Sequence, residues 1–162
     1  MTTKIYTSRY ANRELRNVFD YYYVGISRGK PKFSLPYIIN EQIYMFAPSR
    51  EIWDLPEEEF NKKYKEGLDK YGIERVKSFI DETVKRSNGR KAVFLCFEDV
   101  RVDGEFCHRT AFAEWVRENL GYEVEELDDP TPPKVKKPKK AKTESSKPTE
   151  DKQYSQLSLF DI

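Results

Sequence analysis

The sequence predicts a single α/β domain with a small, at least partly parallel sheet flanked by helices, followed by a disordered basic tail. Three observations lead to this prediction. Residues 92–97 form an apolar run between Lys91 and Glu98, which is typical of a strand buried on both faces. Strand-like and helix-like stretches follow one another in the approximate order β, β, α, α, β, α, β. After Asp128 the composition changes abruptly to lysine and proline.

The first part of the chain favours strands. Residues 5–7 predict a short strand, and residues 18–26 predict a second one because they are rich in aromatic and β-branched side chains. Residues 27–31 contain turn-forming residues that end this strand. Residues 33–39 are expected to be loop or extended chain, since prolines interrupt them.

The second part of the chain favours helices. Residues 54–71 predict one helix from their acidic first turn and regularly spaced apolar residues, and residues 73–86 predict another. The central strand comes next, and a polar loop leads to a helix that begins near Cys107 and stops at Gly121. Residues 122–127, which alternate apolar and acidic side chains, predict a last strand.

Charge separates the body of the protein from its tail. From Pro130 onward there are eight lysines and four acidic residues, so the tail carries +4 and the body −3 within a net charge of +1. A slightly acidic body does not fit a duplex-binding domain, although the tail allows weak, salt-sensitive phosphate contacts. We expect an α/β domain over residues 1–128, a disordered linker over 129–154 that lacks apolar surface to bury, and a terminal peptide over 155–162.

Cysteine content and hydropathy indicate the compartment. The chain has two cysteines, and its first residues have no apolar leader, so we expect a reducing cytoplasm and no disulfide framework. No apolar run approaches the ~20 residues of a membrane span, so no membrane association is expected.

Polar side chains follow three predicted strands. Because ligands bind at the carboxyl ends of parallel strands, we expect these side chains to converge around a phosphate-bearing ligand such as a nucleotide or nucleic acid. The predicted anion-binding residues are Ser8, Arg9, Ser27, Arg28 and Arg109, and the predicted catalytic residues are Glu98, Cys107 and His108.

Cys107 is the best candidate for a reactive group. A thiol at a helix N-terminus, beside His and Arg, is expected to have a lowered pKa and to act as a nucleophile or redox thiol. His108, the only histidine, is a proton shuttle, a metal ligand or the cap of the helix, and Glu98 is a base or an orienting carboxylate. The alternative is a buried structural cysteine and a hydrogen-bonded histidine in a non-enzymatic binding module.

Cys96 is expected in the core or as the redox partner of Cys107. A zinc site of Cys96, Cys107 and His108 is disfavoured, because familiar zinc spacings are absent and adjacent Cys and His rarely serve one ion. The sequence therefore predicts no metal, and it identifies no cofactor, since phosphate-loop, dinucleotide and hydrolase motifs are absent.

Three segments resemble a known family. They are Ser27-Arg28-Gly29-Lys30-Pro31, Phe46-Ala47-Pro48-Ser49 and Leu95-Cys96-Phe97-Glu98 with Phe106-Cys107-His108-Arg109. Over about residues 4–127 the chain resembles the family known as domain of unknown function 488. The resemblance implies a small α/β domain with an active site at residues 107–109. Many members have a second cysteine close to the first, whereas here Phe97 and Glu98 follow Cys96, a departure that weakens a metal or dithiol site.

The last residues regain apolar character after a polar linker. Gln156-Leu157-Ser158-Leu159-Phe160 resembles the pentapeptide by which bacterial replication and repair proteins bind the DNA sliding clamp, and it matches at every position. Leu157, Leu159 and Phe160 would fill an apolar cleft, and Gln156 would form a hydrogen bond at the rim of this cleft. The predicted partner is therefore the sliding clamp, with the body either acting in DNA metabolism or serving only as a clamp-binding regulator. The alternative is that this tail folds back on the body.

Overall fold

The structure, a computed structural model, describes residues 2–134. The predicted linker and the terminal peptide therefore lie almost entirely outside the described residues. The elements, in chain order, are β1 (Lys4–Arg9), η1 (Arg13–Arg16), β2 (Tyr21–Gly25), β3 (Glu41–Gln42), η2 (Tyr44–Phe46), η3 (Arg50–Ile52), α1 (Glu57–Tyr71), α2 (Ile73–Ser87), β4 (Lys91–Cys96), α3 (His108–Leu120) and β5 (Glu123–Glu126), where η denotes a short 3-10 helix.

The five strands form one sheet in the order β3-β2-β4-β1-β5. Every pairing is parallel, which confirms the predicted α/β class. β4 lies in the middle, between β2 and β1, and its apolar residues are buried on both faces. The long apolar run is thus explained by its central place in a parallel sheet.

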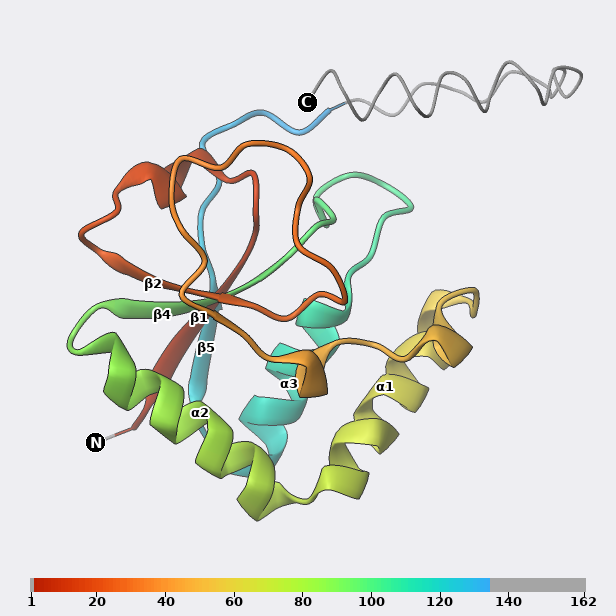
Figure 1. The fold of residues 1–162 in the computed structure, drawn as a ribbon. Helices are drawn as coiled ribbons and strands as arrows, with labels where there is room; N and C mark the ends of the chain where they lie inside the picture. Colours follow the sequence, from red (N-terminus) through yellow and green to blue (C-terminus); the bar gives the residue numbers. More distant parts are fainter. Residues whose placement is uncertain (1, 135–162) are drawn as a thin grey trace, which may run out of the picture.

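Helices cover one face of the sheet. Figure 1 shows α1, α2 and α3 on the same side of the strands. Ala92 and Phe94 of β4 point to this side, where they join Phe46 and the buried faces of the helices in one apolar cluster. Phe94 and Phe112 of α3 lie with ring centroids 5.3 Å apart, so the middle strand and the last helix are packed directly together.

Irregular chain covers the other face. Val93 and Leu95 of β4 point there and meet Tyr21, Tyr23 and Tyr37 in a second cluster. The rings of Tyr23 and Tyr37 stack with centroids 4.0 Å apart, and the Tyr23 hydroxyl donates to the carbonyl of Leu15 at 2.5 Å. The predicted flanking by helices therefore holds for one face only, since tyrosine side chains anchor loops on the other.

Some element boundaries differ from the sequence prediction. β2 begins at Tyr21 rather than at residue 18, because Val18 and Phe19 project into solvent with 37% and 91% of their surface exposed. β3 was not predicted; its two residues pair with the end of β2 and are too few to leave a periodic pattern. Gly121 ends α3 with a φ of 70°, as the sequence predicted. Among the described residues, no helix is long and apolar enough to cross a membrane.

Gly25, the last residue of β2, has no room for a side chain. A Cβ there would overlap the side-chain oxygen of Gln42 and lie 2.7 Å from the hydroxyl of Tyr10. Both neighbours are held by Ser27, through its carbonyl and its hydroxyl, at 2.7 Å each. We predict that Gly25→Ala lowers the free energy of unfolding by about 1–3 kcal/mol, measured by urea denaturation, because these hydrogen-bonded groups must move.

Gly67→Ala is the matched control. Gly67 lies within α1 and a Cβ there would have no atom within 4 Å, so the same substitution should stabilise the protein by about 0.5–1 kcal/mol through helix propensity. Equal effects of the two substitutions would contradict the steric explanation.

Candidate functional site

The parallel register gathers the strand ends at one edge of the sheet. Arg9, the last residue of β1, pairs with Cys96, the last residue of β4, and Gly25 of β2 pairs with Leu95. The segments that follow these strands therefore start side by side. This is the edge at which parallel sheets bind ligands.

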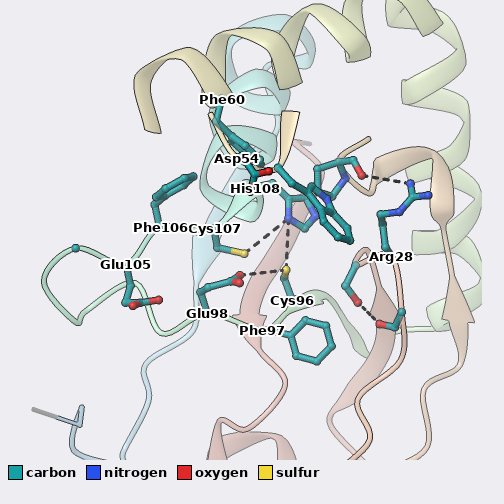
Figure 2. A pocket seen from close by; sticks show the side chains of 15 residues that line it. Arg28, Asp54, Phe60, Cys96, Phe97, Glu98, Glu105, Phe106, Cys107 and His108 are labelled. Atoms are coloured by element: carbon teal, nitrogen blue, oxygen red, sulfur yellow. Dashed lines mark hydrogen bonds between the residues drawn. The ribbon is translucent and has the colours of Figure 1, made fainter. Parts of the chain in front are cut away.

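A cavity of about 540 Å³ opens at this edge, between the ends of β2 and β4 and the start of α3. Its volume lies in the usual range for small-molecule sites. Figure 2 shows side chains from several segments turned toward it. The lining consists of Ser27, Arg28, Gly29, Pro48, Trp53, Asp54, Phe60, Cys96, Phe97, Glu98, Gly104, Glu105, Phe106, Cys107 and His108.

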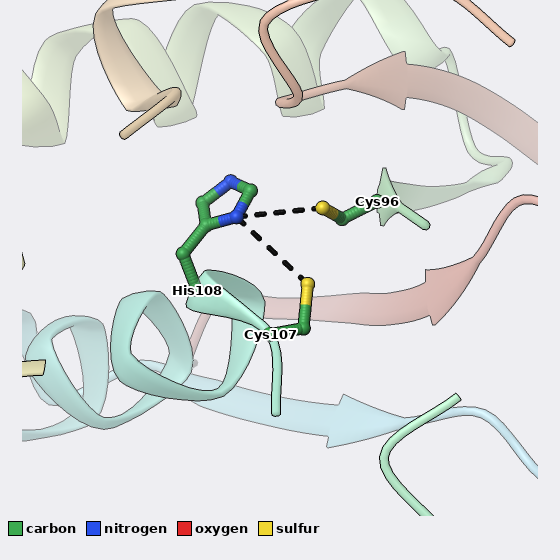
Figure 3. Close-up of side chains that lie close together, drawn as sticks. All are labelled: Cys96, Cys107 and His108. Atoms are coloured by element: carbon green, nitrogen blue, oxygen red, sulfur yellow. Dashed lines mark hydrogen bonds between the residues drawn. The ribbon is translucent and has the colours of Figure 1, made fainter. Parts of the chain in front are cut away.

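Two thiols and the imidazole lie together in the deepest part of this cavity. Cys96, Cys107 and His108 are each no more than 3% exposed. His108 Nδ1 lies 3.4 Å from the Cys96 sulfur and 3.8 Å from the Cys107 sulfur (Figure 3). Cys107 has extended backbone angles and His108 starts the helix, so this change of direction lets adjacent residues approach the same point.

The imidazole is held firmly in this orientation. Its Nε2 lies 2.7 Å from the carbonyl oxygen of Ile26, and because a carbonyl only accepts, Nε2 carries a proton and donates it. The ring also meets Tyr64 of α1 edge-on, with centroids 5.4 Å apart. Nδ1 is therefore the nitrogen that faces the sulfurs, and it shares a proton with them.

The surroundings shift the pKa values of the two thiols in opposite directions. Burial opposes ionisation of Cys107, but hydrogen bonds from Cys96 and His108 and the charge of Arg109 bring the pKa of its thiol well below the usual range. The hydrogen bond to Cys107, together with burial, raises the pKa of the Cys96 thiol far above its usual range. The predicted activation of Cys107 thus has a physical basis in the structure.

Glu98 is the carboxylate nearest to the thiols. Its Oε1 lies 3.7 Å from the Cys96 sulfur, and burial together with the charge of Cys107 raises the pKa of Glu98 to about 7. A carboxyl group that ionises near neutral pH can accept or donate a proton. The three residues predicted to be catalytic, Glu98, Cys107 and His108, are therefore together in one cavity.

Arg109, predicted to bind an anion, does not line the cavity. Its side chain is 1% exposed, and it donates to both carboxylate oxygens of Glu126 at 2.8–3.2 Å and to the carbonyl of Glu98 at 2.7 Å. These bonds tie the start of α3 to β5 and to the end of β4. The donors of Arg109 are thus engaged within the protein, and the structure does not bring this residue to the cavity, where the sequence analysis expected it.

Arg9 and Ser8 also differ from their predicted role. Arg9 Nε donates to the Asp129 carboxylate at 2.6 Å, and the Ser8 hydroxyl donates to the Arg9 carbonyl at 2.9 Å. Neither lines the cavity. The Arg9–Asp129 contact holds the chain where it leaves β5, so the packed body extends to Asp129. Of the predicted anion-binding residues, Ser27 and Arg28 alone reach the cavity.

The sequence analysis missed the aromatic part of the site. Trp53, Phe60, Phe97 and Phe106 line the cavity, from four separate segments. Phe60 and Phe106 lie edge to face, with centroids 5.2 Å apart. Aromatic residues are abundant in this chain and fill its core, so residue type alone could not single these four out. The one available signal was the place of Phe97 and Phe106 in the loop between β4 and residues 107–109.

No family model, curated protein or solved structure matches the chain. The resemblance to domain of unknown function 488 therefore stays a prediction from the quoted residues. The clamp-like peptide, Gln156 to Phe160, lies outside the described residues.

Acidic pH should weaken the ion pairs that Asp99 forms with Arg101 and Arg9. Hydrogen bonds from Arg101 lower the pKa of Asp99 to about 2, and Arg9 adds to this effect. Ionised Asp99 therefore stabilises the folded state above the ordinary value of 3.8, and this contribution should be lost as the pH falls from 3.8 toward about 2. We expect the difference in unfolding free energy between the wild type and Asp99→Asn to shrink over that interval in urea titrations. A difference independent of pH would contradict the prediction.

Proposed function

We propose that the domain binds a nucleotide, free or within a nucleic acid, in the cavity at the carboxyl edge of the sheet, and that its terminal peptide holds it at the DNA sliding clamp. The observation that carries the first part is the composition of the cavity, in which aromatic rings and one arginine surround two thiols and an imidazole.

The aromatic side chains suit a nucleobase. Trp53 and Phe97 are 48% and 40% exposed, so large apolar surfaces are available at the cavity. Flat rings stack on such surfaces, and base stacking on an aromatic side chain contributes about 1–3 kcal/mol. The guanidinium groups of Arg28 and Arg50 lie 5.9 and 5.7 Å from the centre of the Trp53 ring, so a base at Trp53 would bring its phosphate close to positive charge.

Charge limits the kind of nucleotide. Arg28 is one positive side chain in a lining that also holds the acidic residues Asp54, Glu98 and Glu105. A triphosphate, with its larger negative charge, would meet acidic as well as basic side chains in this lining. A single phosphate, as in a nucleoside monophosphate or one link of a nucleic acid strand, fits this balance better.

Cys107 and His108 lie where the ligand would reach the bottom of the cavity. An activated thiol beside an imidazole is the arrangement that thiol-dependent enzymes use. A second candidate is a binding module without catalysis, which the near-complete burial of both cysteines favours. Alkylation separates the two, since a Cys107 thiol that reacts no faster than free cysteine at neutral pH supports the binding module.

Nucleoside monophosphates should quench the fluorescence of Trp53. The other tryptophan, Trp115, is 1% exposed, so a quenching ligand reports on Trp53. We predict saturable quenching by at least one of the four deoxynucleoside monophosphates, and about tenfold weaker binding to Arg28→Ala because a charge-assisted hydrogen bond is lost.

The matching nucleoside and a distant arginine are the controls. Arg28→Ala should weaken nucleoside binding much less than monophosphate binding, because no phosphate is present, and Arg13→Ala, at an exposed site outside the cavity lining, should change neither affinity. Absence of quenching by every monophosphate and nucleoside would refute nucleotide binding.

Sequence supports the clamp as partner. The pentapeptide from Gln156 to Phe160 places three apolar residues in a tail that is otherwise lysine- and proline-rich. Peptides this short bind at roughly micromolar strength, so they act by raising the local concentration of an attached domain. The body would then meet its nucleotide at sites of DNA synthesis or repair.

A pull-down with purified sliding clamp tests the tether. The full-length protein should retain the clamp, and Leu157→Ala/Phe160→Ala should lose it because two side chains that fill the apolar cleft are removed. Asp161→Asn, directly after the pentapeptide, is the matched control and should behave as the wild type. Retention of the clamp by the double variant would show that another surface binds it.

A further inference from the structure

We propose that Cys96, Cys107 and His108 form a binding site for a divalent transition-metal ion, Zn²⁺ in preference to others, with its fourth coordination position open to the cavity. The site lies in the cavity of the proposed nucleotide, but it rests on the geometry of its own donor atoms, so each proposal can fail without the other.

Both sulfur–nitrogen separations are close to what a tetrahedral ion requires. All lie within 4.8 Å of one another, and the two sulfur–Nδ1 separations are 3.4 and 3.8 Å. With ordinary zinc–sulfur and zinc–nitrogen bond lengths, a sulfur and a nitrogen on one tetrahedral ion are about 3.6 Å apart. The observed separations bracket this value, so an ion could bind with small side-chain movements.

Rigid elements hold the donors in place. Cys96 ends the central strand β4, and Cys107 and His108 form the start of α3. The hydrogen bond from His108 Nε2 to the Ile26 carbonyl fixes the ring and leaves Nδ1 as the donor toward an ion. Histidines that bind metals typically use their second nitrogen in this way.

Charge and chemical softness favour zinc. Two thiolates neutralise a divalent ion, which matters for a buried site. Thiolate and imidazole ligands together select zinc over magnesium or calcium. A metal would also explain why two thiols and an imidazole converge in the interior, where an ion takes the place of the protons they share.

The competing explanation is a disulfide between Cys96 and Cys107. Both are free thiols in the structure. A disulfide would need no imidazole directed at both sulfurs, whereas a metal site needs that third donor. The structural detail that favours the metal is therefore the orientation of His108.

The cavity lining forms the surroundings of the fourth coordination position of such an ion. Cys96, Cys107 and His108 all line the cavity, so an ion bound by them would face it. Two cysteines, one histidine and an open position form a set found in catalytic zinc sites. Glu98, whose carboxylate is 3.7 Å from the Cys96 sulfur, is the acidic side chain beside this position (Figure 2).

Cobalt spectroscopy on the full-length, tag-free, reduced protein tests the site. After removal of bound metal with a chelator, titration with Co²⁺ should give one equivalent of tetrahedral cobalt, seen as intense visible absorption with thiolate charge-transfer bands. Zn²⁺ should abolish both signals by displacement. Octahedral cobalt, or no binding by the folded wild type, would overturn the proposal without any variant.

Variants then identify the donors. Cys96→Ser, Cys107→Ser and His108→Asn should each weaken Co²⁺ binding by more than ~100-fold, because each removes a ligand. Asp54→Asn, an acid of the same cavity outside the donor set, should bind as the wild type does. Equal losses in all four variants would show that charge in the cavity, rather than coordination, attracts the ion.

The two proposals are separated by measuring nucleotide quenching with and without Zn²⁺. If the protein binds one equivalent of tetrahedral cobalt but no nucleotide quenches its fluorescence, the metal site is supported and nucleotide binding is refuted. Quenching in a protein that binds no metal does the reverse. A Cys96–Cys107 disulfide that forms in air and is unaffected by Zn²⁺ would replace the metal with a redox pair.

Discussion

The parallel pairing of β4 with both β1 and β2 is the constraint on which the rest of this structure depends. It brings the carboxyl ends of three strands to one edge, and it buries the middle strand on both faces. Cys96 is consequently held at the end of the central, buried strand of the sheet. The chain must then cross to α3 on the helical face, and this crossing brings Cys107 and His108 back to the same edge.

Polar residues at this edge serve two different purposes. On the β1 and β5 side, Arg9 and Arg109 form ion pairs with Asp129 and Glu126, which fasten the end of the body. On the β2 and β4 side, Ser27, Arg28 and Glu98 line a cavity. The sheet order separates these sides, because β1 lies between β4 and β5. Polar side chains at the end of β1 therefore stabilise the fold, whereas those that follow β2 and β4 are available to a ligand.

The cavity combines two kinds of recognition. Four aromatic residues and Arg28 line it, together with soft sulfur and nitrogen donors. A ligand with a flat ring would be oriented by the aromatic part, and its reactive portion would face the thiols or an ion held by them. Binding and chemistry can then be altered separately by substitution, which makes the site open to dissection.

The α/β class, the buried central strand, the end of α3 at Gly121 and the grouping of Glu98, Cys107 and His108 could all be predicted from the sequence. These follow from local patterns, namely apolar runs, helix periodicity and stop residues. The ion pairs of Arg9 and Arg109 could not be predicted in this way, because their partners, Asp129 and Glu126, are distant in the chain. Only the tertiary structure decided that Cys96 and the Cys107–His108 pair converge, since the distance between strand end and helix start is set by packing and not by spacing along the chain.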